Sequence, residues 1–248
     1  MSVFKKAGRL GLTSLAVISL QLGLVSQAGA QDDDDDFLEE EDFFEFDEGP
    51  TIADPFESIN RATFALNDSL YRGVLKPVAV AFRVVPEPAR VSLSNFFSNL
   101  GTPISAINAL LQLDLPNAGT EASRFVINST IGILGLFDPA SSMGLEQDTE
   151  DLGQTLGRYG VGHGFYVVIP FLGFSSLRDG LGSLGNTAAD PILNPLSSGE
   201  IIALNLAEAE TALSLDADTY EALYDSAIDP YIFFRTSYIQ NRAGRVEE

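Results

Sequence analysis

The 248-residue sequence predicts an all-α protein. Segments that carry helix-start and helix-stop signals follow one another from about residue 54 to the end of the chain. Strands with alternating polarity do not recur at regular spacing, and no repeat of fixed period is visible. The length left after an export signal is enough for one domain with a sizeable core.

The first thirty residues predict a cleavable secretory signal. Lys5, Lys6 and Arg9 precede an apolar stretch at 10–25, and small residues follow at 28–30. Polar residues interrupt the apolar stretch, which is shorter than the roughly 20 residues of a transmembrane helix. We therefore expect a signal peptide at 1–30 and a mature protein outside the cytoplasm.

Residues 31–50 predict an acidic, disordered leader. Residues 31–48 hold twelve acids and no base, interleaved with phenylalanines. The leader is either a solubilising tail or a docking segment whose aromatic side chains enter a groove. Residues 49–248 hold 23 acids and 11 bases, and no basic stripe indicates a nucleic-acid partner.

The ordered domain is expected from residue 51 to residue 243, with a tail at 244–248. Asp54, Pro55 and Glu57 predict a capped helix that continues to about Tyr71. Residues 74–88 form an apolar run with three prolines, which favours a short helix or an extended crossover.

Three helices are predicted next, at 89–100, 103–113 and 117–134, with breaks at 101–103 and at Pro116-Asn117. Asn117 is a candidate cap for the third. The end of that segment, 125–137, is apolar nearly all round and too short to cross a membrane alone. It lies either in a protein core or part-way into lipid.

The C-terminal half is also predicted to be helical. Residues 152–159 favour a short helix, a glycine-rich turn follows, and the apolar run 165–174 is either extended or a short buried helix. Another helix starts near Ser175. The last three helices are expected at 199–215, 217–227 and 229–242, the last of them capped by Asp229.

The inventory of chemically active residues is nearly empty. The absence of cysteine excludes disulfides, thiolate metal sites, a cysteine nucleophile and a lipidated cysteine. His163 is the only histidine; without a Gly-x-Ser-x-Gly elbow it more simply occupies a sharp glycine turn. Carboxylate pairs such as Asp148 and Asp151 are better explained as helix caps. The sequence therefore predicts no enzyme, metal site or cofactor, and favours a protein that binds or moves something.

Several blocks, in order, resemble the MlaA (VacJ) family of outer-membrane phospholipid-transport proteins. The blocks are Asp54–Arg61 with Asn60 and Arg61, Pro88–Arg90, Leu93–Leu100, Asn108–Gln112, Arg124–Phe125, Asp138–Ala140, Gly153–Tyr166 with Gly160 and Gly162, and Asp229–Tyr231. Two departures stand out. The chain has no cysteine to lipidate, and the family's proline is absent from Gly173-Phe174-Ser175.

The resemblance implies one ring-like helical domain with an apolar helical hairpin and a central amphipathic channel, lying at the periplasmic side of the outer membrane. Phospholipids misplaced in the outer leaflet would pass through the channel to a periplasmic carrier, which keeps the membrane asymmetric. A trimeric porin is the expected neighbour. Without a lipid anchor, attachment is expected through the helices themselves.

Under this resemblance, the site residues take three roles. The apolar walls and hairpin are expected from Val126, Ile127, Ile131, Ile133, Leu134 and Phe137. Gly132 and Gly135 either let the hairpin hinge as a gate or let it pack closely. Arg124, Arg158 and Arg178 either contact lipid phosphate or form buried structural pairs.

Two other functions remain open at the level of the sequence. A soluble periplasmic lipid shuttle of related fold would have the same motifs. An envelope lipid hydrolase would need His163 to activate a serine or a water.

Overall fold

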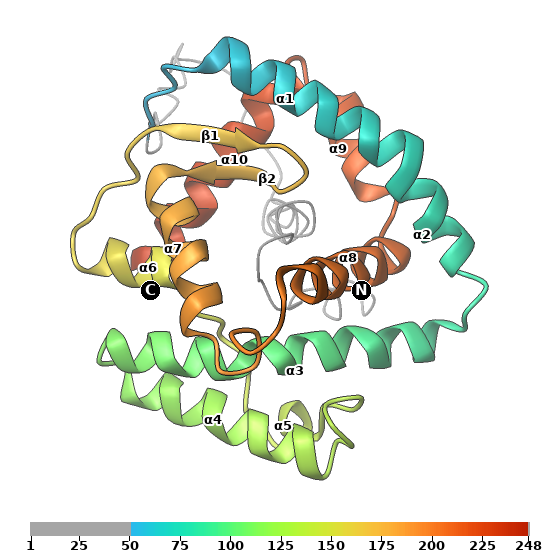
Figure 1. Ribbon diagram of the computed structural model, residues 1–248, viewed down its shortest axis with the longest axis vertical. Helices are drawn as coiled ribbons and strands as arrows, with labels where there is room; N and C mark the ends of the chain where they lie inside the picture. The colour runs from blue at the N-terminus through green and yellow to red at the C-terminus, as the bar shows by residue number, and fades with distance from the viewer. Residues whose placement is uncertain (1–50, 248) are drawn as a thin grey trace, which may run out of the picture.

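The computed structural model describes residues 51–247, so the expected signal peptide and acidic leader lie outside the described residues. The chain follows a ring-like path (Figure 1). Helices α1 and α2 form one side, α3 with α4 forms another, and the strands with α6, α7 and α10 form the third, while α8 lies within the outline. The mostly helical prediction is confirmed, with one small sheet added.

The elements have these bounds: α1 Glu57–Leu70, a π-helical turn η4 Tyr71–Leu75, α2 Lys76–Phe82, α3 Glu87–Leu111, α4 Leu115–Thr130, α5 Pro139–Ser142, α6 Leu152–Arg158, β1 Tyr166–Ile169, β2 Gly173–Ser176, α7 Leu177–Ala189, α8 Ser198–Leu215, α9 Thr219–Ser226 and α10 Pro230–Glu247.

The start of α1 differs from the expected cap. The N-cap position is Phe56, which makes no side-chain cap bond. The Asp54 carboxylate instead accepts hydrogen bonds from Asn60 at 2.8 Å, from Arg235 at 3.0 Å and from the Tyr231 hydroxyl. Partners on α10 therefore use the carboxylate that the sequence assigned to capping, and Asp54 ties the entry of the domain to its last helix.

Helix α3 is continuous through Pro103, so the predicted break at 101–103 is wrong. Pro103 has no N–H to donate to the Asn99 carbonyl one turn earlier, and the Thr102 hydroxyl donates to the neighbouring Ser98 carbonyl at 3.2 Å. Asp114, rather than Asn117, caps α4: its carboxylate accepts from the Asn117 backbone at 3.1 Å. Helix α4 ends at Thr130 and a tight loop continues to residue 137.

The apolar run at 165–174 contains a β-hairpin, which confirms its extended interpretation. Strands β1 and β2 are antiparallel, with Tyr166 opposite Ser176 and Ile169 opposite Gly173. The Asn60 side chain donates to the Tyr166 carbonyl at 3.1 Å and accepts from the Val168 amide at 2.9 Å. This bond pair seats α1 on the edge of the hairpin.

The C-terminal helices largely follow the prediction. Ser176 caps α7, and a capping box of Ser197 and Glu200 opens α8. Asp229 accepts from the Ile232 amide at 3.2 Å at the start of α10. That helix runs to Glu247, beyond the expected domain end at residue 243.

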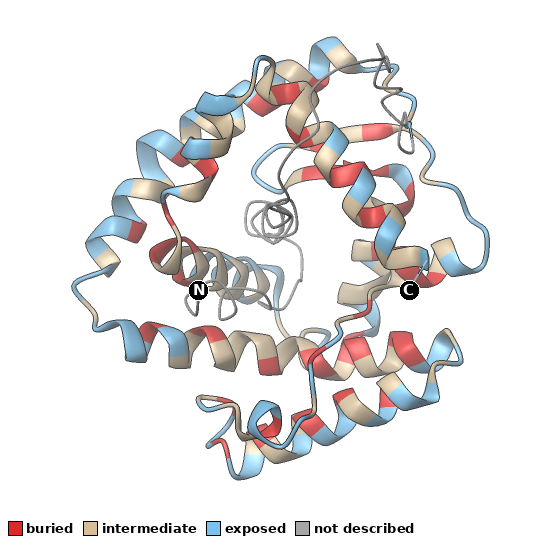
Figure 2. Cartoon of the chain, turned by 180° about the vertical axis from the view of Figure 1, so that it is seen from behind, coloured by how far each residue is buried: buried red, intermediate tan, exposed pale blue. Residues whose placement is uncertain are grey.

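The main apolar core lies where α1, the hairpin, α9 and α10 meet, and the buried parts of the hairpin and α10 lie together in Figure 2. It is built from aromatic rings: Phe234 is fully buried, and its ring stacks on Tyr220 at 5.2 Å and on Phe174 at 5.7 Å. Within residues 51–247, no helix has both the length and the apolar character needed to cross a membrane.

Candidate functional site

The α3–α4 pair has its polar side chains turned inward. On α4 the buried positions are Ala118, Glu121, Arg124 and Asn128, spaced by three or four residues along one helix face. The side of α3 that is buried is similarly rich in serine, threonine and asparagine. A water-facing helix pair buries its apolar stripe, so this pair has the reverse of the usual pattern.

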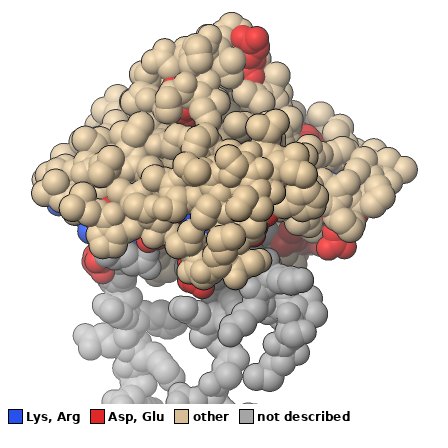
Figure 3. Space-filling model, turned by 90° about the horizontal axis from the view of Figure 1, so that it is seen from below, with Lys and Arg blue, Asp and Glu red and all other residues tan. Residues whose placement is uncertain are grey.

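The opposite, outward side is apolar. Between residues 91 and 145 the charged side chains are Asp114, Glu121, Arg124 and Asp138. Glu121 and Arg124 are buried, and Asp138 faces Arg124. Viewed from the side of α3, α4 and α5, the molecule shows an almost uncharged surface with acids at its margins (Figure 3). An uncharged apolar surface of this kind suits contact with lipid or with an apolar partner.

We define the outer surface by the exposed large apolar residues of the C-terminal half of α4 and the loop that follows it, which are Val126, Ile131, Ile133, Leu134 and Phe137, each more than half exposed. An open groove of about 350 Å³ on α4 is lined by Ala122, Ser123, Val126 and Ile127. The expected wall residues thus lie together. Except for the half-buried Ile127, they are exposed and do not pack into the core of the described residues.

The loop at 131–137 is compact and strained. Its amides donate back onto α4 and within the loop: Leu134 to the Ser129 carbonyl at 3.0 Å, and Gly135 to the Asn128 carbonyl at 2.8 Å. Ile133 and Leu134 have φ angles of 55° and 58°. Such left-handed conformations cost side-chain-bearing residues about 1–2 kcal/mol each, and a β-branched residue adopts them only when its surroundings hold it there.

The two glycines of this loop pack closely. A Cβ on Gly132 would lie 2.5 Å from the Asn128 carbonyl oxygen, and a Cβ on Gly135 would lie 2.5 Å from the Cβ of Asn99 on α3. Gly135 also has a φ of +88°. Both positions therefore need glycine for close approach, which is the packing alternative for these residues; their role as a hinge stays a prediction.

The three candidate arginines lie in different settings. Arg124 is buried and donates to Asp138 at 3.0 Å and to Ser141 at 3.1 Å. Arg178 is buried and donates to Asp179 at 2.9 Å. Both fit the structural alternative. Arg158 is exposed at the end of α6, and the described residues give it no hydrogen bond or ion pair. The Arg178 guanidinium lies beside Gly157, next to Arg158 in the chain, whereas Arg124 belongs to α4.

Segment 146–151 is an extended strap bound by the inner polar faces of α3 and α4. Ser105 accepts from the Glu150 amide at 2.7 Å, and Glu121 accepts from the Asp148 amide at 3.0 Å. Glu121 is fully buried, and burial raises the pKa of its carboxyl to about 7. Burial also raises the pKa of the Glu150 carboxyl to about 7, although Gln112 and Gln154 donate to it.

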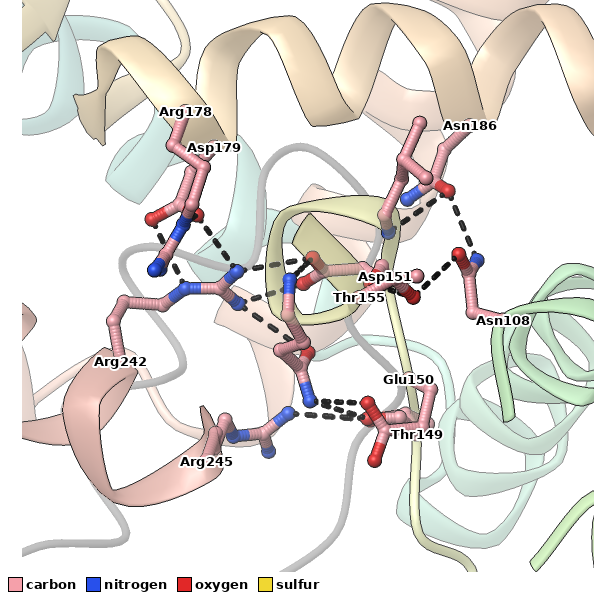
Figure 4. Close-up of polar contacts among 12 residues, drawn as sticks. Asn108, Thr149, Glu150, Asp151, Thr155, Arg178, Asp179, Asn186, Arg242 and Arg245 are labelled. Carbon is pink, nitrogen blue, oxygen red and sulfur yellow. Dashed lines mark hydrogen bonds and ion pairs between the residues drawn. The ribbon is translucent and has the colours of Figure 1, made fainter. Parts of the chain in front are cut away.

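A second polar cluster joins α6 and α7 to α10 around Arg242 (Figure 4). This arginine donates to Asp151 at 2.6 and 3.0 Å and to Asp179 at 3.0 and 3.1 Å. Burial acts to raise the pKa of Asp179, but Arg242 holds it well below its ordinary value. On the other side of α6, Thr155 donates to Asn108 of α3 at 3.1 Å. The cluster closes the ring-like path between its first half and its last helix.

His163 lies half-buried in the turn between α6 and β1. Burial and then the nearby Arg178 lower its pKa, which favours the neutral imidazole. Its Nδ1 atom is buried and has no partner among the described residues, so none of them orients the ring as the acid of a triad would. The glycine-rich turn around it includes Gly160 in the left-handed region at φ +83° and Gly162 in open space.

The remaining motif residues have structural contacts. Arg61 makes a two-pronged ion pair with Asp229 at 2.9 and 3.2 Å, and its hydrogen bond lowers the pKa of that carboxyl. Asp54 and Asn60 hold α1 as described above. The roles of Asn99, Glu121 and Arg242 were not predicted from the sequence. For Glu121 the available signal was the three- and four-residue spacing of polar side chains within the otherwise apolar α4.

Known proteins resemble this chain over most of its length. Residues 52–245 match the family model described as MlaA lipoprotein. The intermembrane phospholipid transport system lipoprotein MlaA of Escherichia coli K12 is 39% identical over 198 residues, 76% of each chain. Its namesake from Haemophilus influenzae is 32% identical over 200 residues, 79% of this chain and 80% of the relative. An uncharacterised protein of Rickettsia typhi is 32% identical over 202 residues, 79% of each chain.

A solved structure has the same fold. It concerns the structural basis for maintenance of bacterial outer membrane lipid asymmetry, and it superposes with a TM-score of 0.72 at 35% identity. The match covers 78% of this chain and 99% of that one.

Proposed function

Because this chain belongs to the MlaA family, we propose that it transports phospholipids at the outer membrane. In this proposal it removes mislocalised phospholipids from the outer leaflet and passes them through an amphipathic channel to a periplasmic carrier. Lipid asymmetry is thereby maintained. A trimeric porin is the proposed neighbour in the membrane.

The single observation that carries the proposal is the reversed polarity of α3 and α4. In lipid, polar groups must find partners inside the protein, while apolar side chains face the acyl chains. Glu121, Arg124 and Asn128 are buried with partners, whereas Val126 and Ile131 are exposed. This arrangement supports attachment through the helices, with the outer surface in the inner leaflet of the outer membrane.

We assign the head-group contact to Arg158. A phosphate needs an accessible guanidinium, and Arg124 and Arg178 are buried with internal partners. Arg158 is exposed beside Tyr159, an aromatic residue that is 65% exposed. Exposed tyrosine and arginine together suit the level of lipid head groups.

The test places charge on the outer surface. A salt wash should release the double variant Val126→Asp/Ile133→Asp from the membrane pellet. Cells with this variant should also have more phosphatidylethanolamine in the outer leaflet, measured by labelling its amine with a membrane-impermeant reagent. The control is Ile228→Asp, a fully exposed residue in the segment between α9 and α10. Wild-type retention and lipid asymmetry in the double variant would show that this surface does not face lipid.

The salt wash and one further variant separate transport from the two alternative functions. A soluble lipid shuttle would wash off the membrane as the wild-type chain. A lipid hydrolase would lose turnover of envelope phospholipid in His163→Ala, whereas the transport proposal expects unchanged turnover in that variant.

A further inference from the structure

We propose that Asn99 of α3 is the positioning residue that holds loop 131–137 in its strained conformation, and that breaking its hydrogen bond to Ser129 releases the loop. The inference rests on the proposed transport function in one respect: the loop, which carries Ile133 and Leu134 of the outer surface, is taken as the gate for phospholipid entry.

Asn99 contacts both ends of the strained segment. Its Nδ2 donates to the Ser129 hydroxyl at 3.0 Å, at the last turn of α4. Its side chain also lies directly under Gly135, where a Cβ would come within 2.5 Å. Asn99 is 5% exposed. This buried side chain of α3 therefore contacts both the end of α4 and the loop.

The hold on the loop from α3 is weak. Among the described residues, the hydrogen bond from α3 to the loop itself runs from Asn95 to the Leu136 carbonyl at 3.4 Å, which is at the outer limit of a hydrogen bond, whereas Asn99 donates to Ser129 at the end of α4. The Oδ1 atom of Asn99 is buried and has no partner among the described residues. A buried acceptor without a partner and the strained backbone both disfavour the closed state, and the Asn99–Ser129 bond adds to the loop's own amide bonds in opposing them.

The segments on either side of the loop are firmly fixed. The Asn128 side chain donates to Asp138 at 2.9 Å and accepts from the Ala140 amide at 3.1 Å. Arg124 also binds Asp138 at 3.0 Å. Release at Asn99 would thus move residues 131–137 while their two ends stay in place, which is the behaviour of a gate rather than of local unfolding.

Hydrogen exchange of the loop amides in the purified full-length chain tests the inference. Asn99→Ala and Ser129→Ala should each raise exchange at Leu134 and Gly135 by about fivefold to tenfold, the effect of losing one hydrogen bond. The double variant should add little to either single one, because both remove the same bond. Ser129→Thr keeps the hydroxyl, so its loop amides should exchange at the wild-type rate.

Two further measurements separate the possible causes. A nitroxide on Leu134→Cys, the only thiol of that variant, should become more mobile in Asn99→Ala. Asn60→Ala removes another buried asparagine, far along the sequence, and should leave loop exchange unchanged. Exchange within twofold of wild type in Asn99→Ala, or equal loosening in Asn60→Ala, would overturn the assignment.

The link to transport has its own outcomes. The level of outer-leaflet phosphatidylethanolamine should differ from wild type in Asn99→Ala and equal wild type in Ser129→Thr. The gate is overturned if Asn99→Ala loosens the loop but leaves this lipid level unchanged, in cells where deletion of the chain raises it. No change on deletion overturns the proposed function and leaves the role of Asn99 in the loop standing.

Discussion

Replacing Glu121 by glutamine should stabilise the protein at neutral and higher pH but not at acid pH. The folded-state pKa is about 7, against about 4.3 for an unfolded glutamate. Because the folded value is raised, the stability due to the protonated carboxyl is present below the unfolded pKa and is lost as the pH rises to about 7. Glutamine keeps the acceptor for the Asp148 amide and cannot ionise.

The expected size follows from the two pKa values. A difference of roughly 2–3 pKa units corresponds to about 3–4 kcal/mol of unfolding free energy. The unfolding free energy of Glu121→Gln minus that of wild type should therefore be near zero at about pH 4, rise between about pH 4.5 and 7, and then level off.

Denaturant unfolding in detergent across that range measures the difference directly. Glu87→Gln removes one carboxylate from the exposed start of α3 and should change stability by less than about 0.5 kcal/mol. An equal difference between Glu121→Gln and wild type at acid and neutral pH would refute the reasoning.

Two further predictions use matched pairs of variants. Arg242→Met leaves Asp151 without its cation and Asp179 with Arg178 alone, and should cost about 3–5 kcal/mol of unfolding free energy. Arg61→Met breaks a partly exposed pair and should cost about 1 kcal/mol or less; denaturant titration compares the two variants. Gly182→Ala forces a methyl against the α6 backbone, 2.5 Å from an amide nitrogen, and should lower stability by about 1–3 kcal/mol. Gly119→Ala meets nothing within 4 Å on α4 and should raise it by about 0.5–1 kcal/mol. A shared sign for the two alanine variants in thermal unfolding would contradict the packing argument.

Local chemistry predicted the helices whose caps are made locally. Ser176, Ser197 and Asp229 each accept from the amide three residues ahead, so their signals lie within one turn of sequence. Asp54 has the same local signal, but its partners lie on α10, about 180 residues away in the chain. A cap prediction from sequence cannot weigh such a competitor, because only the fold brings it near.

The sequence predicted which residues make up the candidate site, but not which side of the molecule they face. The apolar residues 125–137 were recognisable, yet whether they face a core or lipid depends on which side of α4 meets α3. That choice is made by Glu121 and Arg124, whose partners on the strap and at Asp138 follow later in the chain. Pro103 was misjudged for a related reason, since packing of α3 outweighs the local tendency of proline to end a helix.

The reversed polarity also indicates what holds each half of the molecule together. Where α1, the hairpin and α10 meet, Phe234 and its neighbours bury apolar area, so removal from water supplies the stabilising free energy. If the outer surface lies in lipid as proposed, apolar burial cannot pair α3 with α4, because acyl chains solvate their leucines and valines equally well. The pairing must then come from bonds such as those of Glu121, Arg124 and Asn99. In that case the half that faces lipid is also the half whose stability depends on hydrogen bonds, and the Asn99–Ser129 bond is one of the bonds that hold loop 131–137 there.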